Sequence, residues 1–305
     1  MDGILIIDKP QGLTSHDVVA AARRALRESR IGHTGTLDPL ATGVLPLAIG
    51  RATRLVRFLT SSDKDYLATI RFGATTDSYD ADGEETSRSD THPDRSALDE
   101  AVQGLRGRYA QMPPAFSAKK VAGTRAYELA RRKQEVVLTP VPVDVSRAEV
   151  VAFDGWSAQV ALTVSAGFYV RAFAHSLGQA VGTGAYLQGL QRTRSGEFRL
   201  EEAMALDDLS TDDDGVGARD GSHERVLDWV IPMDRLLSSF PAVRVTDEGR
   251  VWVGHGRALT AEQYEQCEGP ASGDWIRLFD SSGHLLAVAT PGSSPGSLHP
   301  TVVLN

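Results

Sequence analysis

One acidic side chain stands in a short stretch that otherwise holds glycines, a proline and small residues. Residues 32–43 read GHTGTLDPLATG, and Asp38 is the acid among them. Glycines let the backbone approach a ligand closely, and small side chains leave space around a carboxylate. With a reference pKa of about 3.9, an aspartate is ionised at neutral pH and available as a nucleophile or a base. Composition alone leaves a second interpretation open, in which Asp38 only forms a turn with its own loop.

Motifs for two other kinds of site are missing. No Gly-Lys-Ser/Thr follows the glycines and G-x-G-x-x-G does not occur, so a phosphate-cradling loop is not indicated. The eight histidines lie scattered without H-E-x-x-H spacing. The single cysteine, Cys267, can supply neither a thiolate cluster nor an internal disulfide. The sequence therefore predicts no metal site.

Charge is distributed unevenly along the chain. The net charge of -8 argues at first against a nucleic-acid partner, because phosphates require local positive potential. Residues 104–135, however, carry eight basic side chains against Glu128 and Glu135, a net charge of +6. Residues 76–100 and 200–230 have net charges of -7 and -8, are poor in apolar residues and are predicted to be solvated loops. The basic segment is the candidate for phosphate contacts.

Length and hydropathy bound the class of protein. A chain of 305 residues suffices for one large domain and a small one. The first residues, MDGILIIDKP, have no cationic region before a long apolar run, and no stretch approaches the roughly 18 to 20 apolar residues of a membrane span. We expect a soluble cytoplasmic protein.

Hydrophobic spacing predicts the elements that would position Asp38. Residues 3–7 are a short strand, and a helix follows, with Thr14 and Asp17 as its capping box. Further strands are predicted at 66–72, 145–153 and 158–165, and helices at 95–105, 124–133 and 169–181, with Gly182 ending the last. Pro140 and Pro142 make residues 136–145 a connector or an edge strand. From about residue 240, short strands separated by turns indicate a small β module.

Six motifs, in order, resemble those of the pseudouridine synthase family, in its bacterial tRNA T-loop (pseudouridine-55) branch. The string GHTGTLDPLATGVLPLAIGRATR, which begins at Gly32, is similar to the catalytic motif of that branch. The other motifs are GILIIDKPQGL from Gly3, SDKDY from Ser62, PPAFSAKK continuing to GTRAY from Pro113, GFYVR from Gly167 and LQRTR from Leu190. Together they cover about residues 3–200.

The resemblance implies roles for the matching residues. Asp38 is the implied catalytic carboxylate and Arg171 its partner, since a guanidinium stays charged and can hold a carboxylate ionised. Tyr66 is implied to stack on the extruded base. Without the resemblance, Arg171 would be interpreted as a surface arginine and Tyr66 as a core aromatic. The implied substrate-binding residues are His33, which would fill the gap left by the flipped nucleotide, the pocket supports Lys9 and Tyr169, Leu190, and the phosphate contacts Lys119, Lys120, Arg131 and Arg132.

The resemblance also implies a fold and a reaction. The fold would be α+β, with a mixed, mostly antiparallel sheet in a catalytic domain over residues 1–235, an RNA-gripping insertion at about 106–143 and a PUA-like RNA-binding module over 240–305. The reaction would be isomerisation of the uridine at position 55 in the T-loop of tRNA, after the base is flipped out. It breaks the N1–C1′ bond and rejoins the uracil through C5, so it needs no metal or organic cofactor. The implied partner is the T-arm stem-loop, bound by a monomer without a guide RNA or a membrane.

Two rival functions stay open at this point. One is an RNA-binding or RNA-folding protein without catalysis, and the other is a synthase that finds its target through a guide RNA. The sequence also departs from the family pattern in two places. Gln191 stands where a basic residue is expected, and the acidic insert at residues 207–228 has no functional account.

Overall fold

A computed structural model of the chain describes residues 1–116, 120–121, 124–125, 138–209, 226–266 and 274–304. Its largest element is an 11-stranded sheet with the main order β14-β1-β3-β12-β4-β11-β10-β7, to which β2, β13 and β15 add at the sides. Among the strands that the structure describes in this sheet, β1 with β14 and β12 with β3 run parallel and the other pairs run antiparallel. This confirms the predicted α+β class with a mixed, mostly antiparallel sheet. The strands are β1 (Gly3–Lys9), β2 (Ile31–His33), β3 (Ala41–Ile49), β4 (Lys64–Phe72), β7 (Gly107–Gln111), β10 (Val141–Phe153), β11 (Ser157–Val164), β12 (Ala185–Ser195), β13 (Phe198–Arg199), β14 (Met204–Ala205) and β15 (Ile231–Pro232).

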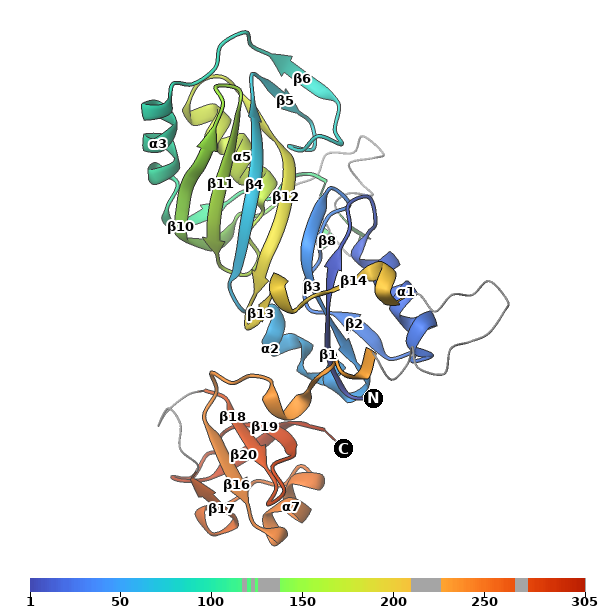
Figure 1. Ribbon diagram of the computed structural model, residues 1–305. Helices are drawn as coiled ribbons and strands as arrows, with labels where there is room; N and C mark the ends of the chain where they lie inside the picture. Colours follow the sequence, from blue (N-terminus) through green and yellow to red (C-terminus); the bar gives the residue numbers. More distant parts are fainter. Residues whose placement is uncertain (117–119, 122–123, 126–137, 210–225, 267–273, 305) are drawn as a thin grey trace, which may run out of the picture.

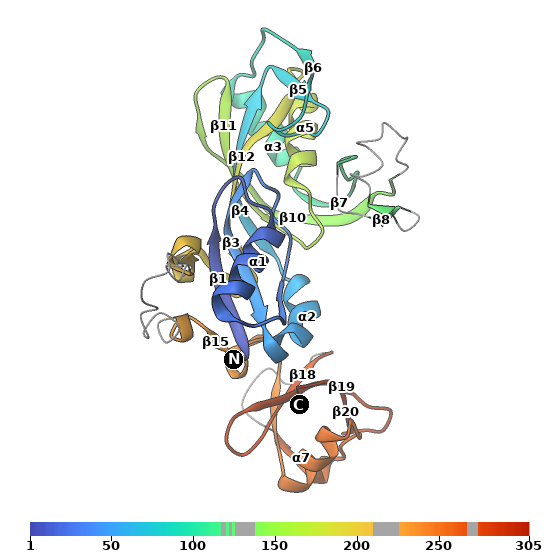
Figure 2. The ribbon, with the colours of Figure 1, turned by 90° about the vertical axis from the view of Figure 1, so that its right-hand side faces the viewer.

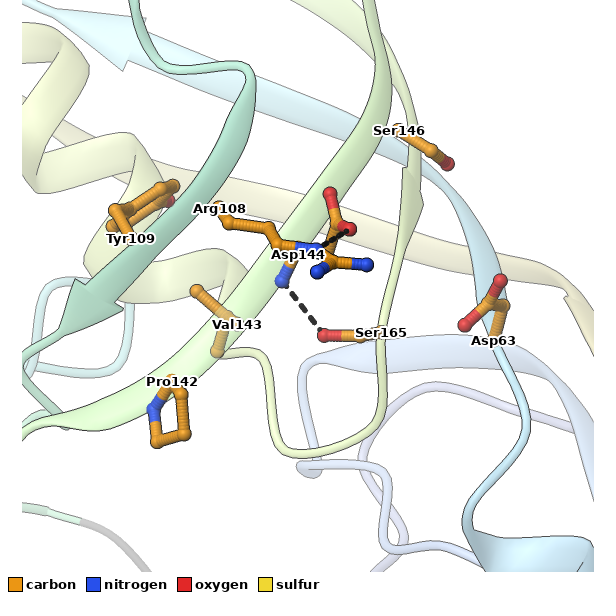
Figure 3. A pocket seen from close by; sticks show the side chains of 8 residues that line it. All are labelled: Asp63, Arg108, Tyr109, Pro142, Val143, Asp144, Ser146 and Ser165. Atoms are coloured by element: carbon orange, nitrogen blue, oxygen red, sulfur yellow. Dashed lines mark hydrogen bonds and ion pairs between the residues drawn. The ribbon is translucent and has the colours of Figure 1, made fainter.

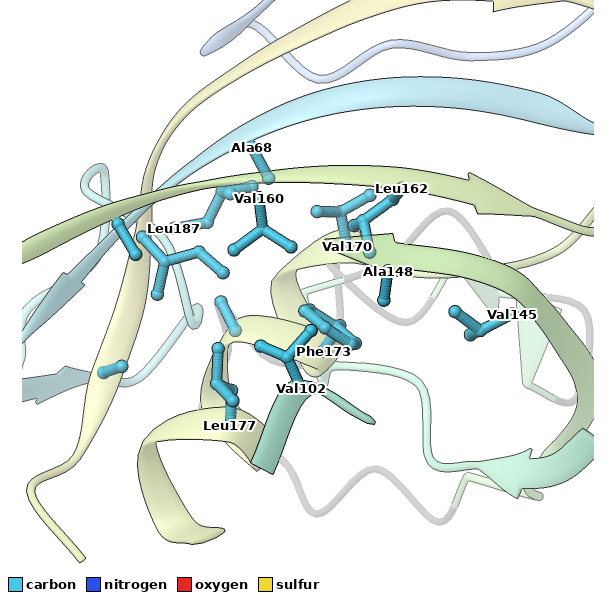
Figure 4. Close-up of a cluster of buried hydrophobic side chains, with 14 of the residues drawn as sticks. Ala68, Val102, Val145, Ala148, Val160, Leu162, Val170, Phe173, Leu177 and Leu187 are labelled. Atoms are coloured by element: carbon cyan, nitrogen blue, oxygen red, sulfur yellow. The ribbon is translucent and has the colours of Figure 1, made fainter. Parts of the chain in front are cut away.

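Three helices cover one face of this sheet and enclose two hydrophobic clusters. Helices α3 (Arg95–Gly104) and α5 (Val170–Ala180) pack Val102, Phe173 and Leu177 against strand residues such as Val160, as Figure 4 shows. Helix α1 (Ser15–Leu26) packs its buried side chains against alternate residues of β1 and β3. Tyr66 of β4 and Leu190 of β12 contact both clusters, so the cluster packed against α1 and the cluster packed against α5 meet at these two neighbouring strands.

The opposite face of β1 and β3 joins the large sheet to the C-terminal module. The module is a five-stranded sheet of order β17-β16-β18-β19-β20 with helix α7 (Asp247–Gly254). It lies at one end of the molecule, next to β1 and α2 (Val56–Thr60) (Figures 1 and 2). Phe58 of α2 makes edge contacts with Trp275 and Phe240, with ring centroids 4.8 and 6.0 Å apart. The module strands are β16 (Ala242–Val245), β17 (Tyr264–Gln266), β18 (Ile276–Phe279), β19 (Leu285–Pro291) and β20 (Leu298–Val303).

Several local predictions are confirmed by the structure. The side chain of Thr14 accepts a hydrogen bond from the backbone of Asp17 and the backbone of Thr14 donates to the Asp17 carboxylate, the predicted capping box. Gly182 has φ +74° directly after α5 and its C-cap residue, where a left-handed glycine ends a helix. Pro142 lies in the first part of β10. Among the described strands, this part pairs with β7, and β11 pairs with β10 only from Val145 onward, so the N–H that Pro142 lacks is not needed for pairing with β11.

Two local predictions are wrong or only partly testable. The acidic stretch at residues 76–100 is not a solvated loop throughout. It contains the end of β5 (Ala74–Thr76), β6 (Glu85–Arg88) and the start of α3, and the side chains of Ser78 and Asp80 are buried between the two short strands. The helix predicted at 124–133 begins instead with a short strand, β9 (Thr124–Arg125), which pairs with β8 (Lys120–Val121); residues 126–137 lie outside the described ranges. In the part of the chain that the structure describes, no helix is long and apolar enough to cross a membrane.

Three short 3-10 helices lie next to strands of the large sheet: η1 (Gly50–Leu55) follows β3, η2 (Leu200–Glu202) follows β13 and η3 (Leu206–Leu209) follows β14.

Candidate active site

Asp38 and Arg171 meet although 133 positions separate them in the numbering. Asp38 lies in the loop between β2 and β3, and Arg171 is the second residue of α5. The Nε atom of Arg171 lies 3.0 Å from Oδ2 of Asp38. The guanidinium side chain is only 9% exposed, whereas the Asp38 side chain is 44% exposed. A buried fixed cation thus holds a carboxylate that a ligand can still reach, which suits a nucleophile or a base.

Asp80 is a second carboxylate on the same guanidinium, and sequence reasoning missed it. Its Oδ2 atom lies 3.2 Å from Nη1 of Arg171, and its side chain is 7% exposed. The Oδ1 atom of Asp80 accepts hydrogen bonds from the Ser78 hydroxyl and the Asp82 backbone. Removing a charge from water is costly unless it is paired and hydrogen-bonded, and Asp80 is both. It therefore holds Nη1 of Arg171, whereas Asp38 contacts Nε.

The hairpin between β5 and β6 brings Asp80 to the site. Leu187 of β12 donates its N–H to Tyr79 O and accepts from Ala81 N, both at 2.9 Å. The Tyr79 ring stacks on His175 of α5 with centroids 3.9 Å apart. The available signal was the run of Asp, Ser and Gly around Asp80, which is typical of tight turns. Counting charge over the whole stretch hid that pattern.

Negative potential accumulates around this guanidinium. The pKa of Asp82 is raised, first by burial and then by the nearby carboxylates of Asp80 and Asp38. Two carboxylates share one guanidinium, so Asp38, Asp80 and Arg171 together carry more negative than positive charge. Arg171 also donates to Ser78 O at 3.4 Å, which adds a further anchor to the hairpin.

Lys9 supports the Asp38 loop from below and is fully buried. Its ammonium donates to the carbonyls of Pro10 (2.8 Å), Leu13 (2.6 Å) and Pro39 (3.5 Å). Burial lowers the pKa of Lys9 to about 8, while the charge of Asp38 acts in the opposite direction. The structure thus places the Lys9 ammonium against backbone carbonyls of the loop and out of contact with solvent.

Arg192 supports the other side of the same loop. Only 1% of it is exposed, and it donates to Val44 O at 2.7 Å, Gly35 O at 3.1 Å and Thr36 O at 3.5 Å. Ser15, at the start of α1, both donates to Leu37 O (3.0 Å) and accepts from Leu37 N (2.8 Å). Buried side chains therefore bind backbone groups before and after Asp38. These bonds fix the loop, and the Asp38 side chain stays 44% exposed.

The remaining predicted residues surround this loop at different depths. Tyr66 and Leu190 are half-buried and pack against both hydrophobic clusters. One cluster contains Leu37 and the other Leu40, which precede and follow Asp38 in the loop. His33 ends β2, and burial, followed by the charge of Arg192, lowers the pKa of its imidazole. Tyr169 is half-buried at the N-cap of α5, two residues before Arg171.

The predicted phosphate contacts are not placed by the structure. Lys119, Arg131 and Arg132 lie outside the described residues, and of Lys120 only the backbone, in β8, is described. Within the described ranges, no group of three His, Cys, Asp or Glu side chains is arranged to hold a metal ion.

A cavity of about 540 Å³ opens at the root of the insertion (Figure 3). Neither Asp38, Asp80 nor Arg171 lines it. Its lining residues come from β7, β10, the residue before β4 and the residue after β11: Asp63, Arg108, Tyr109, Pro142, Val143, Asp144, Ser146 and Ser165. The cavity is therefore separate from the contact between Asp38 and Arg171.

Comparison with known proteins shows the family of the chain. Residues 23–170 match the model of the TruB family pseudouridylate synthase N-terminal domain, and residues 171–238 match the tRNA pseudouridylate synthase B C-terminal domain. The tRNA pseudouridine synthase B of Solibacter usitatus is 43% identical over the whole of both chains. That of Heliobacterium modesticaldum is 40% identical over 91% of this chain and 87% of its own.

Among solved structures, the archaeal box H/ACA sRNP Nop10-Cbf5 complex contains a chain with a TM-score of 0.72 and 26% identity, covering 99% of this chain and 86% of that one. A chain of a Cbf5-Nop10-Gar1 complex has a TM-score of 0.74 and 25% identity, with coverage of 99% and 85%. The likeness thus extends through both the large sheet and the C-terminal module. The chain belongs to the TruB family of pseudouridylate synthases, the family of tRNA pseudouridine synthase B, and is an isomerase.

Proposed function

We propose that this protein isomerises the uridine at position 55 in the T-loop of tRNA, with Asp38 as nucleophile or base. One observation carries the proposal: a half-exposed carboxylate is aimed by a buried arginine 3.0 Å away. The family match supports the reaction type, and the relatives named tRNA pseudouridine synthase B support tRNA as the substrate.

The reaction asks little of the protein beyond access and electrostatics. A stacked uridine hides C1′ and C6, so the base must leave the stack at a cost of about a few kcal/mol. The N1–C1′ bond then breaks, the uracil turns, and a C5–C1′ bond forms while C5 loses its proton and N1 gains one. Asp38 starts this sequence by attacking the nucleoside or by removing a proton from it. Arg171 holds the carboxylate in place through their ion pair.

Tyr66, His33 and Leu190 would shape the space for the flipped base. The half-buried ring of Tyr66 offers a flat surface beside the Asp38 loop, and aromatic stacking on an unstacked base is a common means of RNA recognition. Burial lowers the pKa of the His33 imidazole, which favours the neutral ring, and a neutral ring can fill a gap in the RNA stack without carrying a charge.

The test measures tritium release from a transcribed T-arm stem-loop that carries 5-tritiated uridine. Wild-type protein is compared with Asp38→Asn and with a matched control, Asp99→Asn, on the exposed side of α3. We expect release by wild type and the control, and none by Asp38→Asn, with RNA affinity unchanged within about a few-fold. Turnover by Asp38→Asn would remove the aspartate from its proposed role.

The same assay separates the proposal from its rivals. A synthase that depends on a guide RNA would be inactive on the bare stem-loop, and so would a protein that only binds RNA. Adding total cellular RNA and protein would restore activity in the first case and not in the second. Activity of the purified chain on bare RNA is the expected outcome.

A further inference from the structure

We propose that Gln111 is a positioning residue, which connects the RNA-gripping insertion to Arg171 through the backbone of Tyr169. Gln111 is the last residue of β7, the strand with which the insertion of about residues 106–143 begins. The inference rests on the proposed function, because its readout is the rate of the reaction on RNA.

The contact between Gln111 and Tyr169 uses both halves of one side-chain amide. The Nε2 atom of Gln111 donates to Tyr169 O at 3.0 Å, and its Oε1 atom accepts from Tyr169 N at 2.8 Å. Gln111 is only 5% exposed, so water cannot readily replace either bond. The Tyr109 side chain also hydrogen-bonds Gln111. A rotation that broke the pair would still cost the buried amide its two bonds to the Tyr169 backbone.

This contact lies at the start of the helix that carries Arg171. Tyr169 is the N-cap residue of α5, and its own side chain makes no capping hydrogen bond. The clamp from Gln111 therefore supplies the fixed point at this end of the helix. Arg171 follows two positions later and must reach Asp38 and Asp80 together. A misplacement of about 1 Å in such a group can cost about a hundredfold in rate.

The returning strand of the insertion holds the same loop at a second point. Asp144 of β10 donates its N–H to the Ser165 hydroxyl at 2.8 Å, and Ser165 donates its N–H to Asp144 O at 2.9 Å (Figure 3). Pro113 and Pro114, just after Gln111, are buried. Both ends of the insertion are thus attached to residues 165–169, the segment that leads into α5. RNA bound by the insertion would act on Arg171 through this attachment.

Two substitutions of similar size test the clamp. In Gln111→Glu the carboxylate can accept from Tyr169 N but repels Tyr169 O, and Gln111→Met removes both bonds. The matched control is Gln103→Glu on α3, whose amide oxygen is bonded only to the exposed Arg106 among the contacts described. Single-turnover tritium release and filter binding are measured on the same T-arm RNA, with thermal melting of each variant.

We expect the single-turnover rate to fall by about tenfold or more in both Gln111 variants, with RNA affinity within about threefold of wild type. The Gln103→Glu control should keep the wild-type rate. If Gln111 acts through Arg171, its substitution should cost less than about threefold when introduced into Arg171→Lys. A merely structural role would produce a loss of the same size in both backgrounds.

Rates within about twofold of wild type for both Gln111 variants, or fully additive losses with Arg171→Lys, would overturn the inference. Absence of release by the wild type would instead refute the proposed function, and the inference would fall with it. The two failures are distinguishable because the first requires an active wild-type enzyme.

Discussion

The Oδ2 atom of the buried Asp80 lies 3.2 Å from Nη1 of Arg171, and the same guanidinium contacts Asp38 through Nε. The two residues come from a surface hairpin and from the first turn of α5, and the contact closes the hairpin onto the helix. Arg171 consequently has one partner that is accessible to a ligand and one that is not. This arrangement fixes the direction of the guanidinium whether or not a substrate is present.

Substituting Asp80 should therefore damage catalysis more than RNA binding. In Asp80→Asn the side chain keeps its size but loses the charge that holds Nη1, so Arg171 can turn away from Asp38. We expect the single-turnover rate to fall by about ten- to a hundredfold, with RNA affinity nearly unchanged. Asp90→Asn, on the exposed side of the same acidic stretch, is the control and should behave as wild type. Equal rates for the two variants would contradict the role of Asp80.

Gly43 should tolerate no side chain, because β3 and β12 approach each other closely there. A Cβ atom at Gly43 would lie 2.3 Å from the backbone oxygen of Arg192, and its φ is +97°. Gly107 has a similar φ of +87°, but nothing lies within 4 Å of the position that a Cβ atom would take there. Urea denaturation should show a loss of about 3 kcal/mol or more for Gly43→Ala, against about 1 to 2 kcal/mol for Gly107→Ala. Equal losses would mean that only the backbone conformation matters.

Two buried lysines should make stability depend on pH. Burial lowers the pKa of Lys9 and of Lys64 from 10.5 to about 8, and the charge of Arg192 acts in the same direction. Between pH 8 and 10.5 the unfolded chain therefore binds more protons at these sites than the folded chain does, so the free energy of unfolding should rise with pH there. Urea midpoints measured from pH 7 to about 9.5 should increase in wild type and rise less in Lys9→Met. A midpoint that falls over this range would contradict the assignment.

The cations of the insertion should determine how salt affects RNA binding. If Lys119, Lys120, Arg131 and Arg132 contact phosphates, replacing all four with glutamine should weaken binding and reduce the steepness of its salt dependence. Each lost contact removes about 0.7 to 0.9 from the slope of log affinity against log salt. Filter binding at several salt concentrations measures this slope, and replacement of Arg23, Arg24, Arg27 and Arg30 around α1 provides a comparison with equal charge. An unchanged slope in the insertion variant would place the phosphate contacts elsewhere.

The sequence by itself indicated several of the elements and singled out Asp38 as the candidate catalytic acid. Hydrophobic alternation indicated β4 and β11, the capping box located the start of α1, and Gly182 marked the end of α5, because these signals depend on residues close together in the chain. The motif around Asp38, with its resemblance to the pseudouridine synthases, indicated the reaction and paired Asp38 with Arg171.

Only the tertiary structure decided what surrounds that pair. Asp80 looked like one more charge of a solvated stretch, and Gln111 carried no signal, because burial and partners depend on residues far away in the numbering. Lys9 was expected to support the pocket, but folding decided that its ammonium would be enclosed by three backbone carbonyls. A local pattern specifies how a segment folds, whereas the cost of burying a charge or an amide is set by what the rest of the chain brings into contact with it.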